Sequence, residues 1–198
     1  MNMMTRPASD TRSDTIFAPG PLVLAALIFV AAMSRLLPHP PNFSPVEAIA
    51  LFGGACFASR AWAFAVPLLA LLVSDLVLAA LLGDSYAGYL GGMSFWSVYA
   101  CIALSTALGF GLRGKATAGR LLGYALAGSV LFFVVTNFAA WLASPAYPGT
   151  GAGLLLAYIA GIPFLQWTVL GTIGYAALLF GGFALLRARL PVLRLQTV

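Results

Sequence analysis

The sequence has very few charged residues. Only 8% of its 198 residues are Asp, Glu, Lys or Arg, whereas 62% are hydrophobic. A soluble domain normally has about 25% charged residues, so a chain of this composition could not cover its surface in water. We therefore expect lipid to be the solvent over most of the molecule.

Residue types that carry catalysis or bind metals are also scarce. The chain has one histidine, His39, and two separated cysteines, Cys56 and Cys101, which cannot build an ordinary zinc site. It contains no HExxH, GxSxG, P-loop lysine or CxxC motif. We predict no enzymatic activity, no cofactor and no metal, and we interpret both cysteines as small buried hydrophobes.

Six apolar segments predict an all-α, polytopic membrane helix bundle with about six transmembrane helices. Because a helix needs about 20 residues to cross the hydrocarbon core, the second segment is expected to cross incompletely or to begin within the outer leaflet. The predicted organisation is an N-terminal tail at 1–20, a transmembrane domain at 21–187 and a C-terminal tail at 188–198. The six segments are 21–37, 45–59, 62–82, 95–112, 121–142 and about 162–186.

The basic residues predict the orientation of the bundle. All Lys and Arg residues except Arg35 fall in both tails and in two of the connections, and these basic regions alternate with three connections that have almost no basic residues, 38–44, 83–94 and 143–161. Basic residues are retained on the cytoplasmic side, where they meet lipid headgroups rather than nucleic acid. We therefore expect both termini in the cytoplasm and the three non-basic loops outside.

Asp75 lies inside the third apolar segment, roughly 10 Å from its outer end at a rise of about 1.5 Å per residue. A carboxylate at such a depth costs about 2.5–3.5 kcal/mol on insertion scales, so it should face the interior of the bundle. Two interpretations stay open, an ion pair with Arg35 or a role in ligand binding or gating. Tyr99, Asn137 and Gln166 fall at a similar depth, which indicates either hydrogen bonds between helices or the floor of an outward-facing pocket.

Several further residues near the outer boundary are candidates for ligand contact. Trp96 and Trp141 could form an interfacial belt or the walls of a site, and His39 is either a solvated loop residue, a ligand or a pH sensor. Glu47 follows Ser44 at the spacing of a capping box, although its carboxylate could also meet a ligand. The predicted substrate-binding residues are Asp75, Asn137, Gln166, Tyr99, Trp96, Trp141, Arg35 and His39.

Small residues recur at helical spacing and predict close packing between helices. One pair is Ala103 and Ala107, and a second set consists of Gly171, Gly174, Ala177 and Gly181.

The segment PPNFSPVEAIALFGG at 40–54, together with SDL at 74–76 and TNF at 136–138, resembles a little-characterised bacterial family of membrane proteins assigned to transport. The resemblance covers roughly residues 20–187. It implies a multi-pass protein of the bacterial inner membrane and names no substrate.

The number of segments, the topology and the Gly/Pro-rich loops also resemble the S-components of energy-coupling-factor vitamin transporters. That resemblance implies uptake of a small organic nutrient such as a vitamin, with an ATPase module as a partner. The first segment does not keep the four-residue alanine spacing of many S-components, which fits a solitary carrier such as those for cobalamin. Cys56 or His39 would then be the candidate axial ligands. The alternative function is a non-transporting membrane scaffold or assembly protein.

Overall fold

The computed structural model describes residues 18–190 and 192–193, and every regular element in this part of the chain is helical. The prediction of an all-α bundle is confirmed. Residues 1–17, which make up most of the predicted N-terminal tail, lie outside the described residues, as do 191 and 194–198. The elements are α1 (Pro19–Met33), η1 (Ser34–Leu36), α2 (Val46–Cys56), α3 (Arg60–Leu82), α4 (Asp84–Ala87), α5 (Met93–Gly109), η2 (Phe110–Leu112), α6 (Ala118–Ala143) and α7 (Gly151–Arg189).

Five helical segments are long and apolar enough to cross a membrane: α1 with η1, α3, α5 with η2, α6 and α7. Large apolar side chains such as Val30, Leu81 and Leu178 are more than two-thirds exposed, as expected for surfaces in contact with lipid. α2 has 11 residues, or about 16 Å at 1.5 Å per residue, compared with a hydrocarbon core of about 30 Å. The second predicted segment is therefore helical but too short to span.

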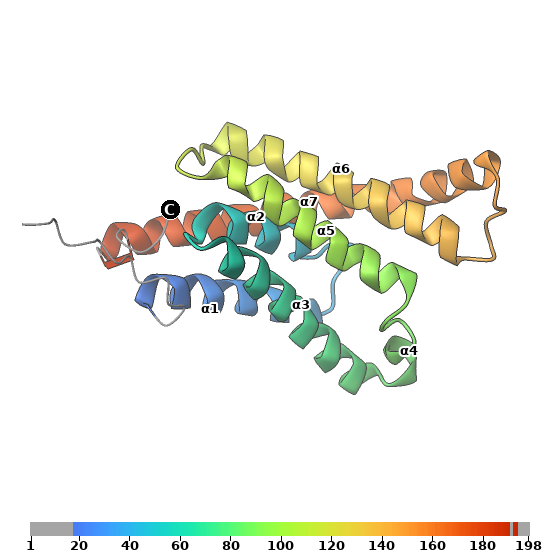
Figure 1. Cartoon of the computed structure of the whole chain (residues 1–198), viewed down its shortest axis with the longest axis horizontal. Helices are drawn as coiled ribbons and strands as arrows, with labels where there is room; N and C mark the ends of the chain where they lie inside the picture. The colour runs from blue at the N-terminus through green and yellow to red at the C-terminus, as the bar shows by residue number, and fades with distance from the viewer. Residues whose placement is uncertain (1–17, 191, 194–198) are drawn as a thin grey trace, which may run out of the picture.

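The long helices run side by side along the longest axis of the molecule (Figure 1). α1, α3 and α6 run in one direction, whereas α2, α5 and α7 run in the other. At one end lie the starts of α3 and α6 and the end of α7, with Arg60, Arg113, Lys115, Arg120, Arg187 and Arg189. We call this the basic end, and we call the opposite end, which holds α4, the α4 end.

α2 forms the centre of the bundle. It contacts α1, α3, α5, α6 and α7, and all 11 of its residues are buried. Gly54 of α2 and Gly109 of α5 allow the two backbones to meet, because a Cβ on Gly54 would collide with the carbonyl oxygen of Thr106 and a Cβ on Gly109 with that of Leu51. These two glycines make the close helix contact that small residues permit.

The C-terminal end of α2 is held at the basic end by Arg113. Its guanidinium donates one hydrogen bond to the carbonyl oxygen of Gly54 (2.9 Å) and another to that of Phe57 (2.8 Å). Cations and hydrogen-bond donors satisfy the free carbonyl groups at the end of a helix. A helix that ends inside the protein therefore has its last turn capped by a side chain from the α5–α6 connection.

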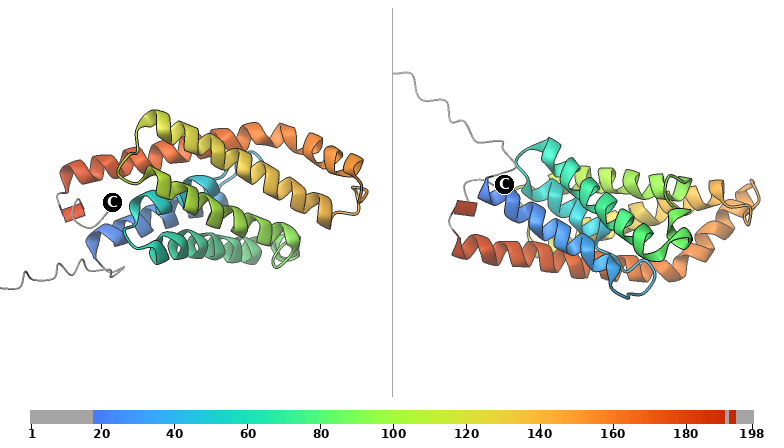
Figure 2. Two further views of the ribbon diagram at one scale, coloured as in Figure 1. Left: turned by 45° about the horizontal axis from the view of Figure 1, so that its top comes forward. Right: turned by 90° about the horizontal axis from the view of Figure 1, so that it is seen from below.

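The prediction that 143–161 is an outer loop is wrong for its second half. α7 begins at Gly151, with the Thr150 hydroxyl accepting a hydrogen bond from the Gly153 amide (3.2 Å), and continues through Pro163 for 39 residues. Proline is tolerated inside transmembrane helices, and a hydroxyl N-cap favours a helix start. Figure 2 shows that the turn between α6 and α7 extends farther from the basic end than α4 does.

The predicted packing role of the small residues on α7 is also wrong in part. Gly171 does pack tightly, because a Cβ there would lie 2.9 Å from the backbone nitrogen of Ser44. Gly174 and Gly181, however, face open space. Ala177 is exposed as well. Gly54 and Gly109 instead bring α2 and α5 together.

Candidate functional site

A buried ion pair connects the end of the first transmembrane segment with the middle of α3. The Arg35 guanidinium lies 2.6 Å from Asp75 Oδ1, and Asp75 is 1% exposed. Arg35 also donates a hydrogen bond to the Ser74 hydroxyl (2.6 Å), which in turn donates to the Leu71 carbonyl (2.8 Å). Asp75 therefore forms the predicted ion pair with Arg35, and this pairing explains how its charge can be held away from water.

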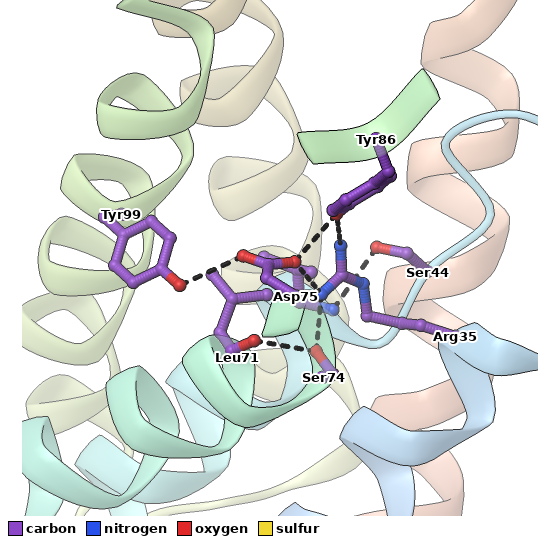
Figure 3. A network of polar contacts seen from close by, with 8 residues as sticks. Arg35, Ser44, Leu71, Ser74, Asp75, Tyr86 and Tyr99 are labelled. Carbon is purple, nitrogen blue, oxygen red and sulfur yellow. Dashed lines mark hydrogen bonds and ion pairs between the residues drawn. The ribbon is translucent and has the colours of Figure 1, made fainter. Parts of the chain in front are cut away.

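Two tyrosines complete the coordination of Asp75 (Figure 3). Tyr86, on α4, donates to Asp75 Oδ1 (2.8 Å) and accepts from Arg35 (3.2 Å). Tyr99, on α5, donates to Asp75 Oδ2 (3.0 Å). We call Arg35, Ser74, Asp75, Tyr86 and Tyr99 the ion-pair cluster; it joins η1, α3, α4 and α5.

The electrostatic environment of this cluster affects the tyrosines of the α4 segment. Burial raises the pKa of Tyr86 to about 12; the nearby Arg35 charge opposes this rise and Asp75 adds to it. Burial also raises the pKa of Tyr89. Both hydroxyls are therefore neutral at physiological pH, and Tyr86 can donate to Asp75.

The cluster lies at the beginning of α2. Val46, the first residue of that helix, packs with Leu71 and with Tyr99, and its amide donates to the Ser44 hydroxyl (3.4 Å). The start of a helix presents unbonded amide groups and a partial positive charge. The ion pair and the start of a buried helix are thus adjacent.

Glu47 is not part of a capping box, contrary to the prediction. Its side chain is 2% exposed and turns into the bundle, where Oε2 accepts a short hydrogen bond from the Ser105 hydroxyl of α5. Oε1 has no hydrogen-bond partner. Every residue of α2 after Glu47 is buried, so the Glu47 side chain lies in the bundle interior rather than in solvent.

Residues 16–193 match the family described as Family of unknown function (DUF6580). The chain belongs to this family. Searches of curated proteins and of solved structures found no match. Membership of the DUF6580 family agrees with the predicted resemblance to a little-characterised family and names no activity or substrate.

Two of the predicted polar residues do not join the cluster in this DUF6580 member. Asn137 donates to the Phe133 carbonyl of its own helix (2.8 Å) and packs against Gly161 of α7. Gln166 is exposed and donates to the Pro163 carbonyl (3.1 Å). The predicted layer of four residues is therefore wrong in composition, because α7 extends past the depth at which Gln166 was placed.

Of the predicted outer aromatic residues and His39, only Trp96 is described next to the ion-pair cluster. Trp96 is 60% exposed, but its ring lies 6.1 Å from that of Tyr99 (centroid to centroid), at the edge of the cluster. Trp141 donates to the Pro148 carbonyl (2.9 Å) and holds the α6–α7 turn. His39 is exposed and contacts the Pro40 carbonyl (3.0 Å), which fits its interpretation as a solvated loop residue.

No group of three or more His, Cys, Asp or Glu side chains that could hold a metal occurs among the described residues. Cys56 is buried at the C-terminal end of α2, beside the basic end, whereas His39 lies in the loop that precedes α2. The two candidate axial ligands therefore lie at opposite ends of α2, and neither belongs to the ion-pair cluster.

The cluster contains two residues that the sequence did not single out as site residues, Ser74 and Tyr86. Ser74 precedes Asp75 and could have been noticed as a second polar residue in an apolar run. Tyr86 carried no local signal, because only the fold of 83–92 over the end of α3 brings it to Asp75. The burial of Glu47 could have been anticipated from the apolar residues on every face of the short segment that follows it.

A separate shallow groove of about 560 Å³ lies on the outside of α5 and α6. Its lining is almost entirely apolar, as expected for a surface that faces lipid. The groove contains no residue of the ion-pair cluster; its lining residues are Leu104, Leu126, Ala127, Val130, Leu131, Val134 and Val135.

Proposed function

We propose that this protein carries a small organic solute, such as a vitamin, across the membrane. The observation that supports this proposal is the buried Arg35–Asp75 pair at the start of α2, a helix too short to cross a bilayer. Ionisable residues within membrane-spanning segments are rare and commonly mark the path of a solute or ion. Interrupted helices that begin inside the protein are a recurring part of transporter binding sites.

The chemistry of the cluster favours a charged or zwitterionic solute. A carboxylate of the solute could replace Asp75 beside the Arg35 guanidinium, where the start of α2 adds a partial positive charge. An ammonium group could replace Arg35 beside Asp75. Either exchange would break the direct Arg35–Asp75 contact and would change the hydrogen bonds of Tyr86 and Tyr99, so binding would alter the position of α4.

We place the α4 end outside the cell and the basic end in the cytoplasm of a bacterial inner membrane, because basic residues are retained in the cytoplasm. Single cysteines at Asp84 and at Lys115, in a background with Cys56 and Cys101 replaced by Ala, test this orientation. An impermeant maleimide added to intact spheroplasts should label the Asp84 position and leave the Lys115 position unlabelled. The reverse pattern would place the cluster on the cytoplasmic side.

The direct test is transport by purified protein in liposomes. A thermal-shift screen of vitamins and other small nutrients first selects compounds that bind, and their labelled forms are then used in uptake assays with and without an added ATPase module. Asp75→Asn should abolish or strongly reduce uptake, whereas Asp84→Asn, which changes an exposed carboxylate on α4, should leave it unchanged. Equal uptake by wild type and Asp75→Asn would remove the assigned role of Asp75. Cobalamin belongs in the screen, because the S-component likeness suggests it.

The second candidate is a non-transporting scaffold. It is favoured by one observation, namely that both Asp75 oxygens already have protein partners. A scaffold predicts that no compound of the screen stabilises the protein and that Asp75→Asn changes only stability. Stabilisation by a nutrient in wild type, lost in Asp75→Asn, would decide for transport.

A further inference from the structure

Glu47 is a buried carboxyl group in the centre of the bundle that the ion-pair cluster does not use. It lies in the first turn of α2 and is 2% exposed. Ser105 of α5 donates to Oε2, while Oε1 has no partner. Gly128 of α6 leaves space beside the carboxyl group, since a Cβ there would lie 3.3 Å from Oε2.

No cation neutralises Glu47 within the described part of the chain, where Arg35 and Asp75 form the ion pair. Cys101 of α5, one helical turn before Ser105, interacts electrostatically with Glu47. On α6, the residue next to the Glu47 carboxyl group is Gly128. Titratable groups on the other elements packed against α2 have their own partners: Arg35 and Asp75 bind each other, Tyr99 donates to Asp75, Tyr175 of α7 bonds Ser34, and Arg113 binds the far end of α2.

An unpaired carboxylate in such a place is costly, because the interior does not replace the solvation of its charge. A carboxylic acid is neutral, and its hydroxyl needs only one acceptor. Protonation of Glu47 removes this charge while the carboxyl group keeps its hydrogen bond to Ser105, because the Ser105 hydroxyl can accept as well as donate.

Further polar atoms without partners lie near the surfaces that pack on α2. The hydroxyls of Thr106 on α5 and Thr172 on α7 are buried and have no hydrogen-bond partner. Thr106 is also the residue whose carbonyl lies against Gly54 of α2, and Thr172 follows Gly171, which packs on Ser44. Hydroxyl groups both donate and accept, so two helices that pack on α2 carry buried hydroxyls with unused hydrogen-bonding capacity.

From this geometry we infer that Glu47 is a proton-binding site and that solute movement is coupled to movement of a proton through it. The coupling to solute movement rests on the proposed transport function, whereas proton binding by Glu47 does not. The Glu47 carboxylate takes a proton from water at the α4 end, which converts it to the neutral acid, and gives the same proton to water at the basic end. No covalent bond other than the O–H bond is made or broken.

The first experiment measures proton binding without any solute. Infrared spectra of the full-length protein in liposomes should contain the carbonyl band of a protonated carboxylic acid at neutral pH, and the band should shift in D₂O. Glu47→Gln should lose this band, whereas Asp84→Asn, the matched change of an exposed carboxylate, should keep it. A wild-type spectrum with no such band from mildly acidic to mildly alkaline pH would overturn the inference.

A second variant keeps the test valid if Glu47→Gln does not fold. Ser105→Ala retains the carboxyl group but removes its hydrogen bond, so the same infrared band should move to the position of a weakly hydrogen-bonded acid. A band that is unchanged in Ser105→Ala would show that it does not come from Glu47.

The coupling is tested with a pH-sensitive dye trapped in the liposomes and a nutrient identified by the uptake assay. Wild type should acidify the lumen as the nutrient enters, and Glu47→Gln should bind the nutrient but lose both the acidification and accumulation against a gradient. Nutrient uptake without acidification, unchanged in Glu47→Gln, would overturn the coupling and leave transport intact. If wild type moves no nutrient, the proposed function and the coupling fail together, while the infrared result still decides on proton binding.

Discussion

Tyr86 donates a hydrogen bond to the same oxygen of Asp75 that Arg35 contacts, at 2.8 Å. One carboxylate oxygen in α3 therefore connects η1, 40 positions earlier in the chain, with the short helix α4. Disturbing either partner should change how α4 is held over the bundle.

Asp75→Asn should destabilise the protein, because it leaves the Arg35 guanidinium buried without its counter-charge. Breaking one partner of a buried pair costs about 3 kcal/mol or more, and the partial exposure of Arg35 places the expected loss near the lower end. Thermal unfolding in detergent measures it. The double variant Arg35→Gln/Asp75→Asn should recover part of the loss. If the two single effects simply add, Arg35 and Asp75 do not interact in the folded protein.

Tyr86→Phe should loosen α4 while leaving the ion pair in place. The change removes hydrogen bonds to Asp75 and Arg35 and keeps the ring, so we expect a loss of about 1 kcal/mol and faster hydrogen exchange in 84–92. Tyr89→Phe is the matched control, because the Tyr89 ring packs on Tyr86 and Phe95 and the described residues offer its hydroxyl no hydrogen bond. Equal exchange in the two variants would contradict the role of the Tyr86 hydroxyl.

Alkaline pH should release α4. The pKa of Tyr86 is raised from 10.0 to about 12, chiefly by burial, so the folded state binds this proton more tightly than the unfolded state does. The corresponding stabilisation is present below about pH 10 and is lost as the pH rises to about 12. Ultraviolet absorbance of tyrosinate and hydrogen exchange of 84–92 should report this transition together. Tyr86→Phe should lack its contribution, and an identical profile for the variant would exclude Tyr86 as the group responsible.

Gly54→Ala should destabilise the centre of the bundle. A Cβ at this position would collide with the Thr106 carbonyl oxygen, and forcing extra volume into a packed contact costs about 1–3 kcal/mol, occasionally more. Gly174→Ala is the control, because it introduces the same methyl group where a helix faces open space; alanine there should be neutral or stabilising by up to about 1 kcal/mol. Comparable thermal midpoints for the two variants would mean that α2 and α5 are not in close contact.

Part of the candidate site could be predicted from residue type and position alone. A carboxylate at Asp75, deep in an apolar run, needs a partner, and Arg35 is a basic residue at the same end of the bundle. Tyr99 was expected at that depth and does bind Asp75. Asn137 and Gln166 were expected there too, but the placement of Gln166 depended on where the last helix begins, and the Gly/Pro-rich connection hid a start at Gly151.

The sequence by itself determined that apolar surfaces suited to lipid cover most of the molecule, that the fold is helical and that basic residues gather at one end. These follow from local properties, namely apolar runs that must form their hydrogen bonds internally and the positions of Lys and Arg along the chain. Tertiary structure alone decided that α2 lies in the centre, that Tyr86 closes on Asp75 and that Glu47 faces Ser105 rather than its own N-cap. The Glu47–Ser105 contact joins residues 58 positions apart, and Phe52 of α2 packs on Phe183 of α7. The geometry of such contacts depends on how the helices pack, which no short stretch of sequence encodes.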